Sequence, residues 1–316
     1  MMTNENWRAV QYLLACSRSG LAHSHDEKTM KWVKPYPEVT GYLLSFFSSH
    51  SKRSEFEPRI KKMVRILLRN QESCGGWKSF QGNSILYFDT VQILKGMFDS
   101  GYWKSDLDVD SAIRRGLNFL KSQTTISGLV FPIYLAHLDA MSSKNNSWSD
   151  GFSGINTKVL ELLHSDAIEE FYPESVSLRS RILDWSLGIP QIDFTHPGAY
   201  QLEGLLAAGE KELVRDRLVK VFLPSLRSNG FIPYRFDLDY AYTSGSAQIG
   251  ILLAKTGFME EASWINNYLR RLISSSSSGG LVQYSDVNGV HVTKIHAESN
   301  SWGTKYFLEL NDALNK

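Results

Sequence analysis

Two kinds of hydrophobic pattern alternate along the chain. The first is an amphipathic stretch such as Ile60, Met63, Val64, Leu67 and Leu68, where apolar residues recur at i, i+3, i+4, i+7 and i+8. That spacing places them on one face of a helix, with charged residues opposite. The second is a short stretch that is apolar almost all round and rich in Gly, Ala and Ser, which predicts a helix buried on every face. We therefore expect half-exposed helices to alternate with fully buried ones.

The alternation repeats six times along the chain. A glycine followed by an apolar residue ends each amphipathic stretch, and these glycines are about fifty residues apart, the spacing of a repeat architecture. They are Gly20, Gly76, Gly128, Gly188, Gly230 and Gly280. The six stretches predicted to be buried are 40–47, 90–98, 157–163, 199–208, 246–253 and 303–310. In the second unit, Pro58 is expected in the first turn of the amphipathic helix, where its missing N–H costs nothing.

These repeats predict an all-α fold, an (α/α)6 toroid of six outer and six inner helices with short hairpins in the outer-to-inner linkers. An open superhelical solenoid is the competing architecture, and it would end in capping repeats with polar outer faces. The last stretch, 302–314, is apolar like an inner helix and needs the first helix, 7–18, to cover it. This favours a closed ring, formed by a single domain over residues 1–316.

Composition narrows the range of functions. The chain has 34 Lys+Arg and 33 Asp+Glu, a formal charge of +1, which argues against a nucleic-acid partner because phosphate binding needs a basic excess. Cys16 and Cys74 are too few for a disulfide framework or a thiolate zinc site. No signal peptide and no long apolar span is visible, so we expect a cytoplasmic protein without membrane insertion.

A ring brings the N-termini of its inner helices to one mouth, where their positive dipole ends converge. We therefore expect one pocket there, built from polar and aromatic residues near the starts of the buried stretches. The candidates for catalysis are Glu38, Asp89, His196, Tyr200 and Glu203. The candidates for substrate binding are Trp32, Tyr36, Tyr42, Gln92, Asn156, Tyr240, Gln248, Trp302 and Lys305. Lys158, Tyr242 and Ser244 stand at similar positions.

Simpler interpretations exist for several candidates. Asp89 is also suited to capping its helix, Glu38 to complementing the helix dipole, and Lys305 to reaching solvent along the surface. Glu203 is harder to explain structurally, because a carboxylate in the middle of an apolar helix is costly unless it is paired. The sequence has neither a phosphate loop nor a dinucleotide fingerprint, and His23 and His25 form only a weak metal-like cluster. We expect no metal and no cofactor.

Six ordered motifs resemble a family of toroid proteins, related to six-hairpin glycosidases and terpenoid cyclases, that bacterial capsule and exopolysaccharide loci encode. The motifs are PYPEVTGY at 35–42, FDTVQIL at 88–94, INTKV at 155–159, HPGAYQLEGLL at 196–206, SGSAQ at 244–248 and SWGTKYF at 301–307. This resemblance implies the (α/α)6 fold and a polysaccharide partner. The segment QESCGGW at 71–77 is also similar to the QW repeats of triterpene cyclases, but the acidic stretch 106–110 lies at the start of an outer helix.

Three functions remain open from the sequence. The first is cleavage of glycosidic bonds in an acidic polysaccharide by a carboxylate pair, with Glu203 as the acid and Glu38 or Asp89 as its partner. The second is a uronate lyase or C5-epimerase, in which Tyr200 and His196 abstract a proton. The third is a non-catalytic glycan-binding protein of a polysaccharide locus.

Overall fold

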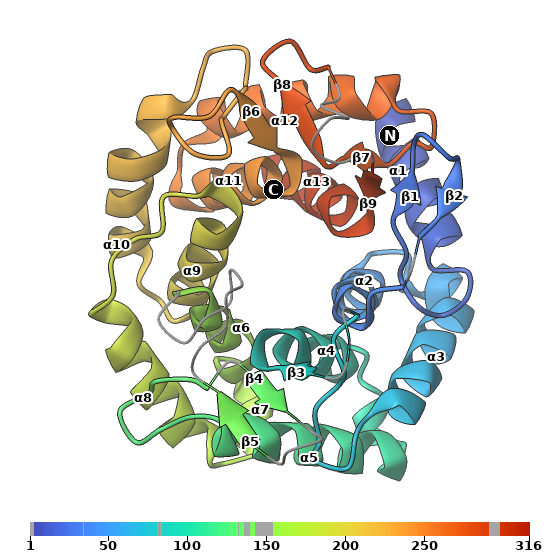
Figure 1. Ribbon diagram of the computed structural model, residues 1–316, viewed down its shortest axis with the longest axis vertical. Coiled ribbons are helices and arrows are strands. Elements are labelled where there is room, and N and C mark those ends of the chain that lie inside the picture. The colour runs from blue at the N-terminus through green and yellow to red at the C-terminus, as the bar shows by residue number, and fades with distance from the viewer. Residues whose placement is uncertain are drawn as a thin grey trace.

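Two concentric rings of helices surround a common axis (Figure 1). The computed structural model describes residues 3–33, 35–80, 82, 84–131, 133–135, 140–142, 154–290 and 298–316. The inner ring contains α2 (Pro37–Ser49), α4 (Tyr87–Asp99), the 3₁₀ segment Gly154–Val159 with α6 (Leu160–Leu163), α9 (Thr195–Ala207), α11 (Thr243–Thr256) and α13 (Ser301–Leu314). The outer ring contains α1 (Asn4–Cys16), α3 (Arg53–Asn70), α5 (Leu107–Ser122), α7 (Asp166–Phe171), α8 (Ser175–Leu187), α10 (Lys211–Arg217) and α12 (Met259–Ser275). Short 3₁₀ or π segments occupy Tyr102–Lys104, Leu218–Phe222 and Leu223–Ser225.

The ring is closed. Each inner helix contacts the next in chain order, and the last, α13, packs against the first, α2. Helix α1 lies outside this junction and contacts both α12 and α13 (Figure 1). The first helix therefore covers the last, which confirms the (α/α)6 toroid and excludes the open solenoid.

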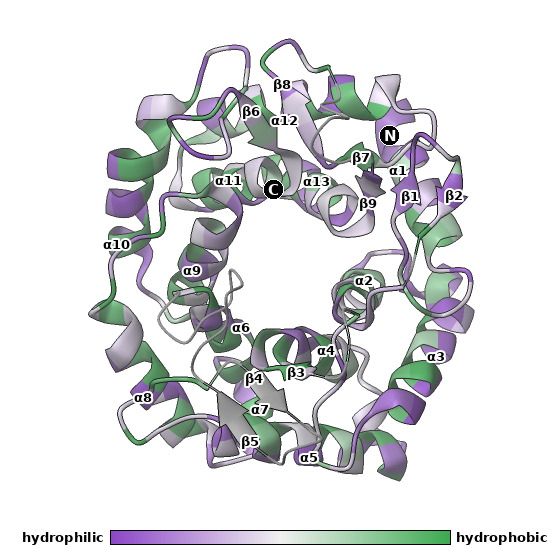
Figure 2. Ribbon diagram, viewed as in Figure 1, coloured by the Kyte–Doolittle hydropathy of each residue, from purple (hydrophilic) through white to green (hydrophobic). Residues whose placement is uncertain are grey.

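Burial explains the two kinds of pattern. The outer helices carry hydrophilic and hydrophobic bands side by side (Figure 2). In α5, for example, Val109, Ile113 and Leu117 are fully buried on one face, as the period of the helix requires. In the inner helix α11, nearly every residue from Thr243 to Leu253 is buried. Hydrophobic burial on both faces of the inner ring thus holds the two rings together.

Glycines let neighbouring inner helices approach closely. A Cβ added at Gly204 in α9 would lie 2.0 Å from the carbonyl oxygen of Thr157, on the neighbouring inner segment. A Cβ at Gly96 in α4 would likewise lie 2.3 Å from the carbonyl oxygen of Gly41 in α2. Heavy atoms do not approach this closely, so the small residues of the buried stretches set the spacing of the inner ring.

The Gly204→Ala variant is expected to lower the free energy of unfolding by about 2 kcal/mol, because overpacking a well-packed contact typically costs 1–3 kcal/mol. Urea unfolding followed by circular dichroism measures this loss. Gly188→Ala is the matched control, since its Cβ would meet no atom closer than 3.5 Å. Equal stability of the two variants would contradict the close approach of α9 to Thr157.

Short strands connect the linkers at one end of the toroid. The strands are β1 (His25–Asp26), β2 (Lys31–Trp32), β3 (Ser84–Leu86), β4 (Ile133–Leu135), β5 (Ala140–Ser142), β6 (Tyr240–Tyr242), β7 (Leu281–Val282), β8 (Tyr284–Asp286) and β9 (Glu298–Asn300). Strands β1 and β2 form an antiparallel hairpin within one linker, as do β4 and β5. Other antiparallel pairs join different linkers: β3 with β4, β6 with β8, and β1 with β9. The predicted hairpins are thus part of a wider set of strand pairs, and the β1–β9 pair joins the first linker to the last.

Two details differ from the sequence prediction. Helix α3 begins at Arg53, so Pro58 lies inside the helix and not in its first turn. The third inner element begins as a 3₁₀ segment, and its α-helical part is only Leu160–Leu163. Pro58 has no N–H, so it removes one backbone hydrogen bond in the second turn of α3.

The segment 71–77 has a structural role. The side-chain amide of Gln71 donates to the carbonyl of Ala112 at 2.8 Å, which ties the end of α3 to α5. The Trp77 indole donates to Leu67 at 2.8 Å and is fully buried. Asp106, in the acidic stretch 106–110, caps the N-terminus of α5. Among the described residues, no helix combines the length and the apolar character that crossing a membrane requires.

Candidate functional site

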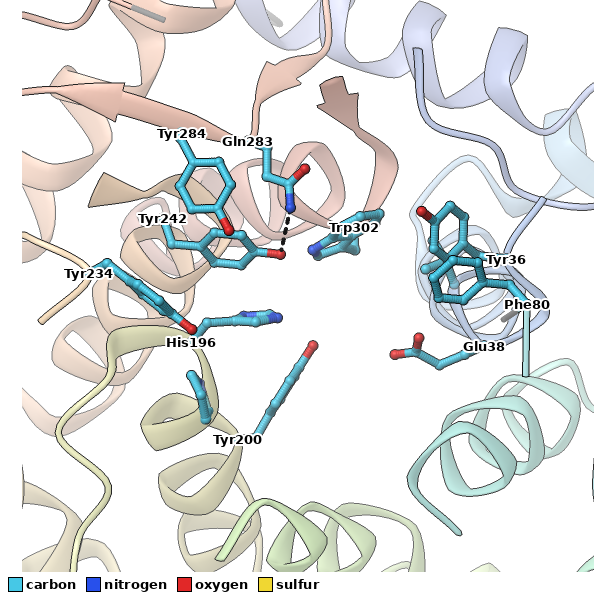
Figure 3. A pocket seen from close by; sticks show the side chains of 12 residues that line it. Tyr36, Glu38, Phe80, His196, Tyr200, Tyr234, Tyr242, Gln283, Tyr284 and Trp302 are labelled. Carbon is cyan, nitrogen blue, oxygen red and sulfur yellow. Dashed lines mark hydrogen bonds between the residues drawn. The ribbon is translucent and has the colours of Figure 1, made fainter. Parts of the chain in front are cut away.

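A cavity of about 320 Å³ lies among the N-terminal ends of α2, α9 and α13 (Figure 3). The carboxyl group of Glu38 projects into it from one side, facing His196 and Tyr200 on the other. We call it the mouth cavity. Its lining residues are Tyr36, Glu38, Val39, Phe80, His196, Pro197, Tyr200, Tyr234, Tyr242, Gln283, Tyr284 and Trp302.

Glu38, which lines the mouth cavity, has a second acid, Asp89, as its neighbour behind the wall. Both lie in the first turn of their helices, α2 and α4, which pack against each other. Burial and the charge of Asp89 raise the pKa of Glu38 well above its usual range, and the Tyr42 hydroxyl offsets only part of this rise. Burial also raises the pKa of Asp89 to about 7. The pair therefore retains a proton near neutral pH.

His196 lies opposite this pair, in the first turn of α9. Its ring packs between Tyr200 and Tyr242, with ring centroids 4.5 and 4.7 Å away. Burial lowers the pKa of His196 to about 3, so the imidazole is neutral at physiological pH. Its Nδ1 lies 2.5 Å from the Oε1 atom of Gln248 on α11. The other ring nitrogen, Nε2, points into the mouth cavity (Figure 3).

Two local features hold His196 in place. Pro197 follows it within the first turn of α9, where a proline fits a helix without losing a hydrogen bond. Helix α11 passes so close that a Cβ at Gly245 would lie 2.7 Å from the backbone nitrogen of His196. Only glycine at this position lets α11 bring its side chains this near to α9.

Aromatic rings cover both walls of the mouth cavity. On the Glu38 side, the ring of Tyr36 lies 4.1 Å from that of Phe80 and 5.7 Å from that of Trp302, centroid to centroid. The facing wall is a cluster of tyrosines whose neighbouring centroids are 5.0 to 5.3 Å apart. These are Tyr234, Tyr242 and Tyr284. Rings with polar edges on two facing walls are suited to a flat ligand that has one apolar face and many hydroxyl groups.

A second cavity, of about 900 Å³, lies at the opposite end of the inner ring. We call it the lower cavity. Charged residues of the inner ring line it, among them Lys95, Lys158, Glu203, Lys305 and Glu309. Lys255 also lines it, from the last turn of α11, where the partial negative charge of the helix C-terminus favours a cation.

Ion pairs satisfy the most buried of these charges. The ammonium group of Lys158 lies 2.6 Å from Glu203 and 2.8 Å from Glu161, and the side chain of Lys158 is only 3% exposed. Lys305 pairs with Glu309 at 2.8 Å. Lys158 holds the pKa of Glu161 down at about 2, against the opposing effect of burial. The cost of burying Glu203 is thus offset by a direct partner.

Three tyrosines separate the two cavities. Tyr200 lines the mouth cavity and Tyr306 lines the lower cavity. Tyr42 contacts both, parallel to Tyr200 at 6.5 Å and edge-on to Tyr306 at 5.8 Å between centroids. Burial raises the pKa of Tyr200 and of Tyr42 well above 10, so their hydroxyl groups stay protonated.

The expectation of one shared pocket is therefore wrong, because the predicted residues do not line a single cavity. Five of them line the mouth cavity: Tyr36, Glu38, His196, Tyr200 and Trp302. Glu203 and Lys305 line the lower cavity. Asp89, Tyr42, Gln92, Asn156 and Gln248 are buried within the inner ring. Tyr240 packs beside Tyr284. Trp32 packs against Tyr12 and His25, and it remains 44% exposed.

Seven of the lining residues were absent from the candidates chosen from the sequence, and four of these seven come from the linkers rather than from the starts of the inner helices. The four linker residues are Phe80, Tyr234, Gln283 and Tyr284, and the other three are Val39, Pro197 and Tyr242, at the starts of α2, α9 and α11. The linkers have no helical period that could mark inward-facing positions. The cluster of three tyrosines after Gly230, at positions 234, 240 and 242, was the one available signal, and it pointed to Tyr234 alone of the four.

Within the part of the chain that the structure describes, no group of three or more His, Cys, Asp or Glu residues is arranged to hold a metal ion. His23 and His25, which the sequence placed in a weak metal-like cluster, each contact a different group in the structure. His23 contacts the carbonyl of Val33 at 2.6 Å, and His25 contacts Glu27 at 3.2 Å. Both ring contacts tie the first linker together.

The Asp89→Asn variant is expected to raise the melting temperature at pH 8 and to leave it nearly unchanged at pH 4. Asp89 ionises at about pH 7 in the folded protein, but near pH 3.9 in an unfolded chain. The folded state thus binds more protons between these values, and stability falls as the pH rises through that window. Asparagine does not ionise, so the variant avoids the loss of stability that ionisation of Asp89 causes as the pH rises.

Thermal unfolding between pH 4 and pH 8 measures this effect. Asp184→Asn is the control, because Asp184 is exposed on α8. A gain for Asp89→Asn that is the same at both pH values would show that Asp89 is ionised in the folded protein throughout.

Known structures share this architecture at low sequence identity. A cellobiose 2-epimerase from Bacillus thermoamylovorans is 10% identical, with a TM-score of 0.73 over 98% of each chain. An unsaturated glucuronyl hydrolase specific for heparin is 12% identical, with a TM-score of 0.70 over 98% of this chain and 95% of that one. The type II terpene cyclase MstE from Scytonema is 14% identical, with a TM-score of 0.66 over 99% of each chain.

These neighbours are (α/α)6 toroid enzymes, and the similarity establishes the fold of this chain. Neither a family model nor a curated protein matches the chain. The three neighbours have different names and different activities, so the fold alone does not identify a reaction.

Proposed function

We propose that the protein is a carbohydrate-active enzyme that cleaves a glycosidic bond in an oligosaccharide or polysaccharide, with Glu38 as the general acid. One observation carries this proposal. The Glu38 carboxyl has a raised pKa beside Asp89 and projects into an aromatic-walled cavity, opposite a neutral histidine. A protonated carboxyl is what the oxygen of a glycosidic bond needs in order to leave as a hydroxyl group.

The reaction balances with residues of the mouth cavity. A sugar ring packs against Trp302, and Glu38 gives its proton to the bridging oxygen as the bond from that oxygen to the anomeric carbon breaks. A water molecule attacks the anomeric carbon while His196 Nε2 accepts a hydrogen bond from it. The proton that this water loses leaves to solvent through His196 Nε2, and the Glu38 carboxylate takes up a proton from solvent to complete the cycle. Asp89 keeps Glu38 protonated between turnovers by raising its pKa.

The substrate class is supported by three independent features. Trp302 and the tyrosine wall suit pyranose rings, two of the structural neighbours are named for sugar chemistry, and the six sequence motifs resemble proteins of polysaccharide loci. The expectation of an acidic glycan rests on the motifs alone. The described lining of the mouth cavity contains no lysine or arginine that would pair with a uronate.

A second candidate, epimerisation, is favoured by the placement of Glu38 and His196 on opposite sides of one cavity. Removing a proton from one face of a sugar carbon next to a carbonyl group, which holds the electron pair as an enolate, and returning a proton from the other face inverts that carbon. In this reaction His196 Nε2 takes the proton and Glu38 supplies the new one.

Incubation with a panel of neutral and acidic bacterial glycans in deuterated water tests the proposal. Hydrolysis gives shorter products with new reducing ends and no ultraviolet absorbance. Elimination gives an unsaturated sugar that absorbs in the ultraviolet, and epimerisation incorporates deuterium at carbon without changing chain length. Glycan binding without any turnover across the panel would contradict an enzymatic role and favour a non-catalytic binding protein.

A further inference from the structure

A line of hydrogen bonds runs through the inner ring from the mouth cavity to the lower cavity. His196 Nδ1 lies 2.5 Å from Gln248 Oε1, and Gln248 Nε2 lies 2.9 Å from Glu203 Oε2. The same Glu203 oxygen lies 2.6 Å from the ammonium group of Lys158. Gln248 and Lys158 are almost completely buried, and Glu203 is 7% exposed.

The direction of each hydrogen bond follows from the chemistry of Lys158. An ammonium group only donates, so the Oε2 atom of Glu203 must be an accepting oxygen. This holds whether the carboxyl is ionised or carries a proton on its other oxygen. Gln248 must therefore present its NH₂ group to Glu203, which leaves its carbonyl oxygen facing His196.

The carbonyl oxygen of Gln248 can only accept a hydrogen bond, so His196 must carry its proton on Nδ1. In a neutral imidazole the second nitrogen then has a lone pair and no proton. In the part of the chain that the structure describes, Nε2 has no hydrogen-bond partner, and it points into the mouth cavity (Figure 3). The hydroxyl group of Ser244 also lies 3.5 Å from Nδ1, at the limit of a hydrogen bond.

We propose that Gln248 is a positioning residue, oriented by Glu203 and Lys158, that fixes His196 as the Nδ1–H tautomer and so presents Nε2 to the mouth cavity as a hydrogen-bond acceptor. The catalytic relevance of this arrangement rests on the proposed function, but the tautomer itself does not.

The helical framework explains why the orienting residues lie so far from the mouth. His196 and Glu203 are seven residues apart on α9, which places them on the same face and about 10 Å apart along the axis. Gln248 on α11 spans part of that distance. Glu203 and Lys158 line the lower cavity, so the state of the histidine in one cavity is set by an ion pair in the other.

Nitrogen-15 NMR of the full-length protein, labelled at histidine, tests this inference without any substrate. The His196 signals are assigned by their loss in a His196→Asn variant. We expect an Nδ1 signal typical of a protonated nitrogen and an Nε2 signal typical of an unprotonated one between pH 6 and pH 8. The opposite assignment in the wild-type protein would overturn the inference.

Variants of the orienting residues give a matched comparison. Glu203→Gln keeps an oxygen that accepts from both Lys158 and Gln248, so the Nδ1–H tautomer is expected to persist. Glu203→Met and Gln248→Leu remove an acceptor and are expected to give a mixture of tautomers. An unchanged pure Nδ1–H signal in folded Gln248→Leu would overturn the role of Gln248, and the wild-type spectrum decides the tautomer if a variant does not fold.

Activity then separates this inference from the proposed function. With a glycan that is turned over, Gln248→Leu is expected to lower kcat roughly ten- to hundredfold, the range seen for partners that orient metal-bound histidines, with a smaller change in KM. A fixed Nδ1–H tautomer together with no turnover on any glycan would contradict the proposed function and leave this inference standing. An unchanged kcat in a variant with mixed tautomers would show that the tautomer does not serve the reaction.

Discussion

Replacing Glu38 with Gln is expected to lower kcat on a cleaved glycan by about 10²–10⁴-fold, the contribution typical of a general acid. Glutamine has nearly the same shape and still donates a hydrogen bond, but it cannot give up a proton. The affinity of the variant for the glycan should therefore stay close to that of the wild type. Initial rates and isothermal titration calorimetry with the same glycan measure the two quantities separately.

The control for Glu38→Gln is Glu55→Gln, which changes a well-exposed acid in the first turn of outer helix α3. We expect wild-type kinetics for this variant. If Glu38→Gln kept more than a tenth of the wild-type kcat, Glu38 would not be the proton donor. The role of Asp89 in raising its pKa would then have no catalytic purpose.

Replacing Lys158 with Met is expected to lower the free energy of unfolding by about 3–5 kcal/mol, the cost of removing one partner from a buried ion pair. The substitution leaves Glu161 and Glu203 close to each other without the ammonium group that contacts both. Chemical denaturation at pH 7 measures the loss. Lys52→Met is the control, because its pair with Glu55 is more than half exposed and contributes about 0–1 kcal/mol.

The pH dependence of this loss has a definite sign. In the wild type, Lys158 holds the pKa of Glu161 at about 2, below its value in an unfolded chain. The stabilisation is therefore complete above about pH 5 and disappears as the pH falls toward 2. The difference between the wild type and Lys158→Met should shrink from pH 7 to pH 3, and a difference independent of pH would contradict the ion-pair explanation.

The fold could be predicted because the burial of apolar side chains, its dominant interaction, recurs at regular spacings along the sequence. Stretches with one apolar face alternate with stretches that are apolar all round, and glycines about fifty residues apart mark each unit. This pattern alone predicts an outer and an inner ring of helices. Even the closure of the ring followed from one detail, the apolar character of the last helix, which α1 covers in the structure. Local departures such as Pro58 inside α3 did not alter the arrangement.

The candidate site was only partly predictable, for a geometric reason. Helical spacing showed that His196, Tyr200 and Glu203 share one face of α9, and the structure agrees. The spacing does not show where along the axis a cavity ends. Tyr42, Tyr200 and Tyr306 fill the middle of the ring, so Glu203 faces a different cavity from His196. The pairing of Glu203 with Lys158 depends on the packing of α9 against its neighbour, which no pattern within one helix reveals.

The most direct test of the central claim is a crystal structure of the Glu38→Gln variant soaked with an oligosaccharide that the wild-type protein turns over. The account predicts a sugar ring in the mouth cavity, packed against Trp302 or the tyrosine wall. The oxygen of the bond to be cleaved should lie about 3 Å from the side-chain amide at position 38. A sugar bound in the lower cavity, or bound elsewhere while the mouth cavity holds none, would contradict it.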